Sequence, residues 1–267
     1  MAEGFPREPV VKPVRGWFGG QLTVTDVSSP PLAGNQKGSS ASMITGRPGR
    51  LVGWSLVSGT ATSQLIDGAP TRVGLFGGTF DPPHVGHLVT AINVHYALDL
   101  DLVLLMVANV PWQKDGTREI TPAEDRLAMV AAAVESVPGL VPGRHELDLG
   151  GNSYTADTLR VLGAEYPGAE LFTIVGDDAA AKLHTWERSA EVRERSRLVV
   201  VDRPGAPVEL DETVEWIHVE VPRLEVSSTD LRSRFCDGRP LDYLVTDPVL
   251  DMIEERSLYG SSDRMVQ

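Results

Sequence analysis

Short apolar runs alternate with amphipathic stretches from about residue 72 onward. This pattern is typical of a parallel sheet whose strands are buried because helices cover both of its faces. The apolar runs predict five strands, at residues 73–76, 102–107, 170–175, 197–201 and 215–220. We therefore expect one α/β domain, over about residues 71–262, with a mainly parallel sheet and helices on both faces.

Two of the intervening helices carry start signals. Thr121 is suited to cap a helix, Pro122 suits its first position, and Glu124 completes a capping box. The pair Asp247-Pro248 opens a last helix in the same way. These signals predict two helix starts that do not depend on the hydrophobic pattern.

Residues 1–70 differ from the rest of the chain. They are rich in Gly, Pro and Ser, carry few charges, and show no sustained helical or strand period. Such a segment buries too little apolar surface to offset the loss of chain entropy on folding. We expect a disordered, low-complexity N-terminal extension, either a dispensable tail or a functional arm, and a short C-terminal tail at residues 263–267.

The composition is that of an ordinary globular protein, with 42% hydrophobic and 23% charged residues. A net charge of −13 argues against a nucleic-acid partner, because binding many phosphates needs clustered Lys and Arg. A mononucleotide needs only a few local cations and remains compatible with this charge. No apolar run approaches the roughly 18 residues of a membrane span, and no secretory signal is evident. We expect a cytoplasmic protein with no membrane partner and, with Cys236 as its only cysteine, no internal disulfide.

The most informative segment, residues 74–88, begins as a buried strand, passes through Gly77-Gly78 and continues as a helix. Ligands of open α/β sheets bind at the carboxyl ends of the strands, which is where this turn lies. Glycines permit unusual backbone geometry and close approach of a ligand, and a helix N-terminus offers amides to an anion. The segment therefore predicts a phosphate-binding turn.

His84 and His87 stand three residues apart at the start of that helix, so one turn can present both imidazoles to the same group. Two imidazole donors suit a phosphate that gains negative charge as it is attacked. An isolated pair with this spacing is also common as an ordinary surface pair. The adjoining Gly-Gly-Thr turn, the prolines and Gly86 favour the phosphate-binding interpretation.

This segment resembles the signature of the H-x-G-H nucleotidyltransferases and, within them, of the bacterial nicotinate-nucleotide adenylyltransferases. Residues 77–87 read Gly-Gly-Thr-Phe-Asp-Pro-Pro-His-Val-Gly-His, a nearly complete and highly specific match. Four more matches follow: Pro-Trp-Gln-Lys at 111–114, Ser-Tyr-Thr at 153–155, Gly-Asp-Asp at 176–178 with Trp186 beyond it, and Val-Ser-Ser-Thr-Asp-Leu-Arg at 226–232. The resemblance covers residues 73 to about 260.

The resemblance implies a Rossmann-like, doubly wound α/β fold and assigns roles to the matching residues. The catalytic residues that it implies are His84, His87, Lys114 and Arg232. The ATP-binding residues that it implies are Gly77, Gly78, Thr79, Phe80, Ser227, Ser228 and Thr229. The mononucleotide-binding residues that it implies are Thr155, Asp178 and Trp186.

Several of these residues also have a structural interpretation, which the sequence leaves open. Lys114 is in a loop, where a lysine is usually solvated, and Trp186 is also suited to a hydrophobic core. Ser228 and Thr229 are good caps for the helix that follows them. Their roles in binding therefore rest on the resemblance.

Three residues depart from the family pattern. Trp112 and Gln113 replace the usual proline and histidine, which alters the loop at the expected substrate entrance. Glu187 follows the tryptophan where a neutral or aromatic residue is common. It puts an anion near the region expected to receive the nicotinate carboxylate.

The activity implied by the resemblance is adenylyl transfer from ATP to nicotinate mononucleotide, with release of pyrophosphate. ATP is expected to arrive with Mg²⁺, and no carboxylate cluster argues for a dedicated metal site. One alternative is another adenylyltransferase of the superfamily, acting on nicotinamide mononucleotide or phosphopantetheine. A second alternative is a nucleotide-binding module without catalysis. ATP and nicotinate mononucleotide are the expected partners, and the sequence leaves a homo-oligomer open.

Overall fold

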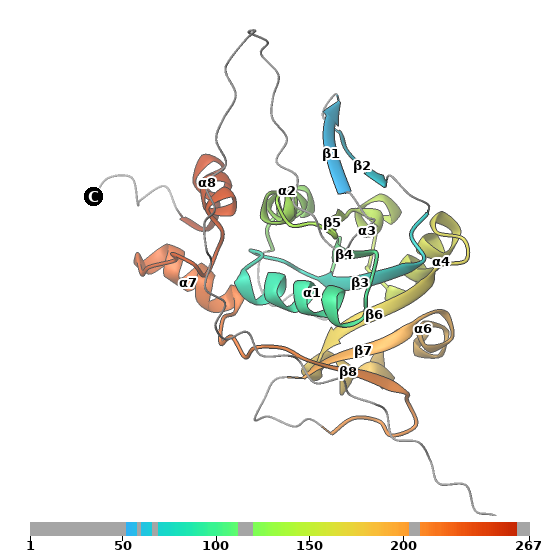
Figure 1. The fold of residues 1–267 in the computed structure, drawn as a ribbon. Coiled ribbons are helices and arrows are strands. Elements are labelled where there is room, and N and C mark those ends of the chain that lie inside the picture. Colours follow the sequence, from blue (N-terminus) through green and yellow to red (C-terminus); the bar gives the residue numbers. More distant parts are fainter. Residues whose placement is uncertain (1–51, 58–59, 66–68, 112–119, 203–208, 261–267) are drawn as a thin grey trace, which may run out of the picture. The chain divides into compact units, whose positions relative to one another are not determined.

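The computed structural model describes residues 52–57, 60–65, 69–111, 120–202 and 209–260. Its main element is a six-stranded sheet of order β5-β4-β3-β6-β7-β8, in which all neighbouring strands are parallel (Figure 1). The strands are β3 (Arg72–Gly78), β4 (Leu102–Val107), β5 (Leu140–Gly143), β6 (Glu170–Gly176), β7 (Arg197–Asp202) and β8 (Trp216–Glu220). The expected α/β fold with a mainly parallel sheet is confirmed.

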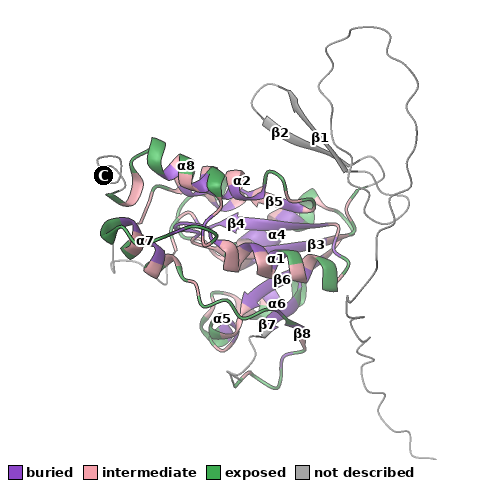
Figure 2. Ribbon diagram, turned by 60° about the vertical axis from the view of Figure 1, so that its left-hand side comes forward, coloured by how far each residue is buried: buried purple, intermediate pink, exposed green. Residues whose placement is uncertain are grey.

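The helices cover both faces of this sheet (Figure 2). They are α1 (Val85–Ala97), α2 (Ala123–Val134), α3 (His145–Leu149), α4 (Thr155–Glu165), α5 (Asp177–Ala180), η2 (Leu183–Thr185), α6 (Ser189–Arg195), α7 (Ser228–Asp237) and α8 (Asp247–Glu255). No helix within the described residues is both long enough and apolar enough to cross a bilayer.

Strand β4 shows why its sequence is apolar throughout. Val103 belongs to a hydrophobic cluster that includes Met129 of α2. The next residue, Leu104, belongs to a second cluster that includes Leu159 of α4. Since side chains alternate across a strand, every residue of a strand covered on both faces must be apolar.

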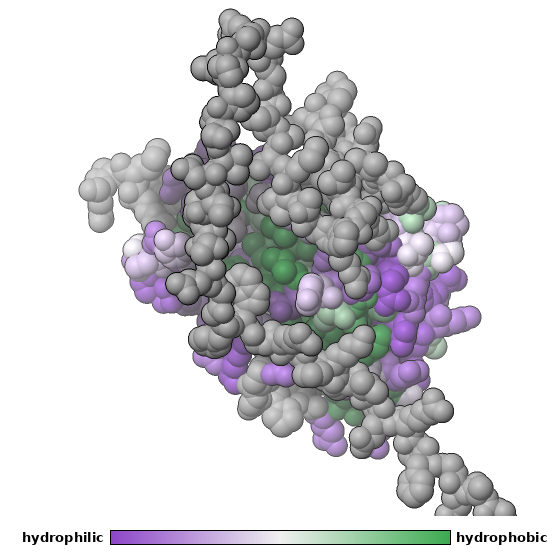
Figure 3. Space-filling model, in the orientation of Figure 1, coloured by the Kyte–Doolittle hydropathy of each residue, from purple (hydrophilic) through white to green (hydrophobic). Residues whose placement is uncertain are grey.

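On the described surface seen in Figure 3, hydrophobic residues gather in the middle, with hydrophilic residues to either side.

The strand order reverses at β3. This strand is hydrogen-bonded to β4 on one side and to β6 on the other. The chain then continues outward through β5 on the first side and through β7 and β8 on the second. In open α/β sheets a ligand binds in the crevice at such a switch point, beyond the carboxyl ends of the strands. The crevice expected here lies beside Gly78 and Gly176.

The structure differs from the predicted elements in three details. Strand β5 is absent from the five predicted strands, because Leu140–Gly143 is short and contains a proline, which only an edge strand tolerates. Helix α2 has Pro122 as its N-cap and no side-chain cap, so the capping role expected of Thr121 is wrong. Asp247 was expected to cap helix α8, which would then begin at Pro248. The helix begins at Asp247 instead, and Thr246 is its N-cap.

Strands β1 (Val52–Val57) and β2 (Thr60–Leu65) form a separate two-stranded antiparallel sheet. This hairpin differs from the expectation that residues 1–70 lack regular secondary structure. Its sequence contains Val, Leu, Thr and Trp, which favour strands, with Val52, Trp54 and Leu56 at alternate positions. The rest of the predicted extension up to residue 51, and the predicted C-terminal tail, lie outside the described residues.

Candidate active site

The loop between β3 and α1 is shaped by a buried phenylalanine. Phe80 is 1% exposed, and its ring lies so close to Gly78 that a Cβ there would be 2.8 Å from it. At Gly77 a Cβ would meet no atom of the described residues within 4 Å. Neither glycine has a positive φ, so space and not backbone conformation explains both of them. Gly78 is required by packing, whereas Gly77 leaves room for a ligand against the backbone.

His84 and His87 face each other at the start of α1. Their rings are stacked, with centroids 3.7 Å apart. The backbone N–H of His84, the N-cap residue, donates to Nδ1 of His87 at 3.2 Å. Because a ring nitrogen that accepts a hydrogen bond carries no proton, this contact favours the His87 tautomer that has its proton on Nε2. The structure therefore makes Nε2 of His87 a hydrogen-bond donor.

Two cavities lie at this end of the sheet. The first, of about 680 Å³ and called the larger cavity below, is lined by segments that are far apart in the sequence. His84 and His87 line it from α1 and the loop before that helix. Residues 227–229 and Arg232 line it from α7 and its N-cap, and the end of β3 forms another part of its border. The histidine pair and the guanidinium expected to act together thus border one cavity.

Helix α7 is attached to the β3–α1 loop through main-chain carbonyls. Oγ of Ser228 donates to the Pro82 carbonyl at 2.9 Å, and Nη1 of Arg232 donates to the Asp81 carbonyl at 2.6 Å. The residues that bond here are about 150 positions apart in the chain, as the separations of 146 and 151 residues show. The late motif is therefore placed by contacts that do not depend on the side chains of the loop.

The capping interpretation of this motif applies one residue earlier than expected. Ser227 is the N-cap of α7, and its side chain accepts a hydrogen bond from the N–H of Asp230 at 3.2 Å. Ser228 and Thr229 are the first two residues inside the helix. Their amides are thus among those that a helix N-terminus presents to a ligand.

Asp81, in the β3–α1 loop, is buried, with 1% of its surface exposed. The Tyr259 hydroxyl donates to Oδ1 of Asp81 at 2.6 Å. Burial, and then this hydrogen bond, raise the pKa of Tyr259 above its usual range, so the phenol stays a donor at neutral pH. The bond ties the segment after α8 to the β3–α1 loop. Neither residue was expected at the site.

A second cavity of about 280 Å³, the smaller cavity, adjoins the first. Four residues line both cavities: Phe76, Gly77, Gly78 and Gly176. Thr155, the first residue of α4, and Trp186 line the smaller cavity, as do Ser153 and Tyr154. Three of the segments singled out in the sequence therefore meet at the switch point between β3 and β6.

Among the described residues, three expected site residues lie outside the cavity lining expected for them. Thr79 lines the smaller cavity and not the larger one. Phe80 is buried and is not among the lining residues of either cavity. Asp178 is exposed in the first turn of α5 and lines neither cavity, but the next residue, Ala179, lines the smaller one. Lys114, like the two residues before it, lies outside the described residues.

Glu146 lines the smaller cavity but was not predicted as a site residue. It is 8% exposed and accepts a hydrogen bond from Oγ1 of Thr158 at 2.9 Å. Burial raises the pKa of its carboxyl, against the lowering effect of hydrogen bonds from Ser153 and Thr158. Helix α3 is too short to show a periodic pattern, so the sequence offers no signal for this residue.

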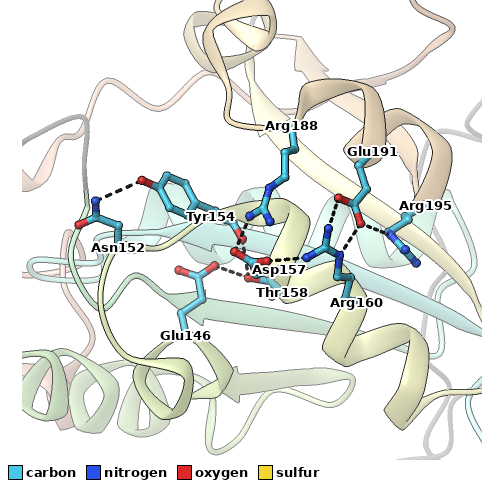
Figure 4. Close-up of polar contacts among 9 residues, drawn as sticks. All are labelled: Glu146, Asn152, Tyr154, Asp157, Thr158, Arg160, Arg188, Glu191 and Arg195. Atoms are coloured by element: carbon cyan, nitrogen blue, oxygen red, sulfur yellow. Dashed lines mark hydrogen bonds and ion pairs between the residues drawn. The ribbon is translucent and has the colours of Figure 1, made fainter.

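Ion pairs join α4 to α6 and to the residue before it (Figure 4). Arg188 pairs with Asp157, and its guanidinium lies over the Tyr154 ring, 5.8 Å from the centroid. Nε of Arg160 pairs with Glu191 at 2.6 Å. Because Arg188 follows the tryptophan of the smaller cavity by two residues, these pairs hold that loop against the helix of the Ser-Tyr-Thr segment.

Two adjoining cavities at the carboxyl ends of β3 and β6, one of them bordered by a histidine pair, are the arrangement of an α/β nucleotidyltransferase. The Cytidylyltransferase-like family matches residues 75–234. A probable nicotinate-nucleotide adenylyltransferase of Corynebacterium kroppenstedtii is 44% identical over 200 residues, covering 73% of this chain and 93% of that protein. One of Mycolicibacterium vanbaalenii is 42% identical over 206 residues, covering 73% of this chain and 95% of that protein. The chain belongs to the nicotinate-nucleotide adenylyltransferase family.

A solved structure has the same fold. It is the Plasmodium falciparum nicotinic acid mononucleotide adenylyltransferase complexed with NaAD, with a TM-score of 0.56 and 14% identity. The likeness covers 71% of this chain and 98% of that chain. At this identity the likeness is one of fold.

Proposed function

We propose that this chain transfers AMP from ATP to nicotinate mononucleotide, giving nicotinate adenine dinucleotide and pyrophosphate. The observation that carries the proposal is the border shared by the two cavities, formed by Phe76, Gly77, Gly78 and Gly176. A nucleotide in each cavity meets its neighbour over the Gly77-Gly78 turn, beside the histidine pair. Membership of the family supports the choice of both substrates.

ATP occupies the larger cavity in this proposal. Gly77, Gly78 and residues 227–229 line this cavity and offer main-chain amides to its phosphates. The N-termini of α1 and α7 also favour anions. Nε2 of His87 donates to the α-phosphate, and His84, stacked on it, is the second imidazole at that group. Arg232 stabilises the negative charge that collects on the leaving pyrophosphate, as Lys114 does from the loop after β4.

The mononucleotide occupies the smaller cavity. Thr155 and Trp186 contact its nicotinate end, because both line this cavity and the amide of Thr155 is at a helix N-terminus. Asp178 reaches the ribose from α5, whose N-cap Gly176 is part of the shared border. The phosphate of the mononucleotide then lies at that border.

The substrate supplies its own nucleophile. The 5′-phosphate is ionised at neutral pH, and one of its oxygens forms the new bond to the α-phosphorus of ATP. The bond from that phosphorus to the β-phosphate oxygen breaks, and pyrophosphate leaves with the electron pair. Catalysis then consists of positioning and charge stabilisation, which need no serine or cysteine nucleophile. Mg²⁺ accompanies ATP, held mainly by phosphate oxygens and water.

The test is to mix the protein with ATP, Mg²⁺ and nicotinate mononucleotide and to follow pyrophosphate and dinucleotide together. We expect equal amounts of both products. Faster reaction with nicotinamide mononucleotide or phosphopantetheine would reassign the acceptor. ATP binding without pyrophosphate release for any acceptor would overturn the proposal and favour a nucleotide-binding module. A cytoplasmic location stays an expectation from the sequence, which leaves a homo-oligomer open.

A further inference from the structure

Arg126 is a buried arginine on α2 and is 1% exposed. It shares one face of the helix with Met129, Val130 and Ala133, all of which are buried. Charged side chains are almost never fully buried unless other groups replace the water around the charge. The groups that surround this guanidinium therefore indicate its role.

Four hydrogen bonds of Arg126 are accepted by main-chain carbonyls. Nε donates to Thr121 at 2.7 Å, and Nη1 donates to Thr79 at 2.9 Å and to Ala108 at 2.7 Å. Nη2 donates to Asn109 at 3.1 Å. These carbonyls belong to the loop after β3, the residues after β4 and the residues just before α2. One planar guanidinium thus links three segments of the chain.

The segments that Arg126 links also form or contact the wall of the smaller cavity. The N–H of Asn109 donates to Oγ of Ser153 at 2.8 Å, and Ser153 is hydrogen-bonded to the buried carboxyl of Glu146. Ser153 and Thr79 both line the smaller cavity, and Gly78, next to Thr79, is part of the shared border. The guanidinium therefore connects the phosphate-binding turn with the wall of the mononucleotide cavity.

We propose that Arg126 is a positioning residue, which sets the distance between the two substrates by fixing the loop after β3 relative to the loop after β4. The inference rests on the proposed function, in which the reacting groups meet at the shared border. In-line attack needs the reacting atoms roughly 3–3.5 Å apart, and a misplacement of about 1 Å costs on the order of 100-fold in rate. The planar fork is essential, because a lysine ammonium cannot reach carbonyls of all three segments at once.

Arg126→Lys tests this role against a matched control, Arg72→Lys. Arg72 lies at the opposite end of β3, where Nε donates to the Leu98 carbonyl at 3.2 Å and the guanidinium pairs with Glu170. Each substitution replaces a planar guanidinium by a lysine ammonium, at the site in Arg126→Lys and remote from it in Arg72→Lys. We expect kcat to fall about tenfold or more in Arg126→Lys and to change less than about twofold in Arg72→Lys. Unchanged kcat in a folded Arg126→Lys protein would overturn the inference.

Amide hydrogen exchange without substrates supplies a readout that does not depend on the reaction. The N–H of Ala108 donates to the Gly78 carbonyl at 3.0 Å, and the N–H of Ser153 donates to the Val110 carbonyl at 3.1 Å. We expect both amides to exchange faster in Arg126→Lys than in the wild type, and at wild-type rates in Arg72→Lys. A wild type that makes no dinucleotide refutes the proposed function, yet unchanged exchange at both amides separately refutes the role of Arg126.

Ser153→Ala covers the case in which Arg126→Lys does not fold. It removes the hydroxyl that accepts from Asn109, at the far end of the connection. We expect KM for the mononucleotide to rise roughly fivefold, the cost of one ordinary hydrogen bond, and KM for ATP to stay unchanged. An unaltered KM for the mononucleotide would overturn the connection, and equal rises for both substrates would show a general loss of structure instead.

Discussion

The two cavities share a border, but their walls are held together differently. Around the larger cavity, Ser228 and Arg232 donate to main-chain carbonyls of the β3–α1 loop, and Tyr259 holds the buried Asp81. Around the smaller cavity, Arg126 fixes the loops after β3 and β4 in the same way, but α4 and α6 are joined by ion pairs between partly exposed side chains, such as Arg160 with Glu191. Exposed pairs of this kind contribute only about 0–1 kcal/mol each.

The difference concerns which part of each wall is fixed. Hydrogen bonds to carbonyls constrain the backbone itself, so these contacts fix the path of the loop that faces the triphosphate. Ion pairs on the surface constrain side chains, and water competes with each of them. Removal of one of the carbonyl contacts around the triphosphate is therefore expected to cost much, and removal of one of the ion pairs between α4 and α6 is expected to cost little.

His87→Ala is expected to have the largest effect. It removes the Nε2 donor proposed to bind the α-phosphate, and the loss of one donor to a developing charge costs about 100–1000-fold in kcat. Turnover is followed by pyrophosphate release, and the melting temperature is measured alongside. His218→Asn, an exposed position on β8, serves as the control and keeps wild-type turnover. Near-normal turnover in His87→Ala would remove this residue from the mechanism.

Arg232→Lys is expected to lower kcat/KM for ATP by about 10–100-fold, because hydrogen bonds of a charged donor are worth about 1.5–3 kcal/mol. The charge is kept, but the fork that reaches Asp81 and Thr229 is lost. Arg234→Lys, on the same helix and paired with Asp230 at 2.6 Å, is the matched control for steady-state kinetics. Equal losses in both variants would point to the stability of α7 and not to the fork.

Tyr259→Phe is expected to lower the free energy of unfolding by about 1–3 kcal/mol, because the buried Asp81 carboxylate loses a donor. Urea titration measures the change. Tyr243→Phe removes the same hydroxyl from a residue that is 94% exposed and should leave the unfolding curve unchanged. Coincident unfolding curves for the two variants would show that the buried contact between Tyr259 and Asp81 does not stabilise the protein.

Arg160→Met is expected to have the smallest effect, less than about 1 kcal/mol in stability, because its partners Glu191 and Asp157 stay accessible to water. High salt should reduce the difference from the wild type further. The mononucleotide KM is the sensitive kinetic measurement. A loss as large as that of Tyr259→Phe would erase the contrast between the two sides of the site.

The elements that depend on residues close together in the chain could be predicted from the sequence. Strands such as Leu102–Val107 are apolar throughout, and the spacing of His84 and His87 on one helical turn places the two rings together. Strand β5 was missed because four residues with a proline carry too little pattern. The hairpin at residues 52–65 was missed because a short alternation stands within a Gly- and Ser-rich segment.

The residues that complete the site needed coordinates, because their partners are distant in the chain. Tyr259 is 178 residues from Asp81, and nothing near either residue indicates the contact. Arg126 did carry a local signal, since it occupies the same helical stripe as Met129, Val130 and Ala133. A charged residue in an otherwise apolar stripe indicates a buried contact, although it does not name the partner.

The common border of the cavities also bears on how the enzyme would be inhibited. A dinucleotide that lies across Phe76, Gly77, Gly78 and Gly176 excludes ATP from one side and the mononucleotide from the other. Under the proposed function, accumulated product competes with each substrate, and a new cycle begins only after the whole molecule has departed. The same geometry favours inhibitors that bridge the border over those that fill one side alone.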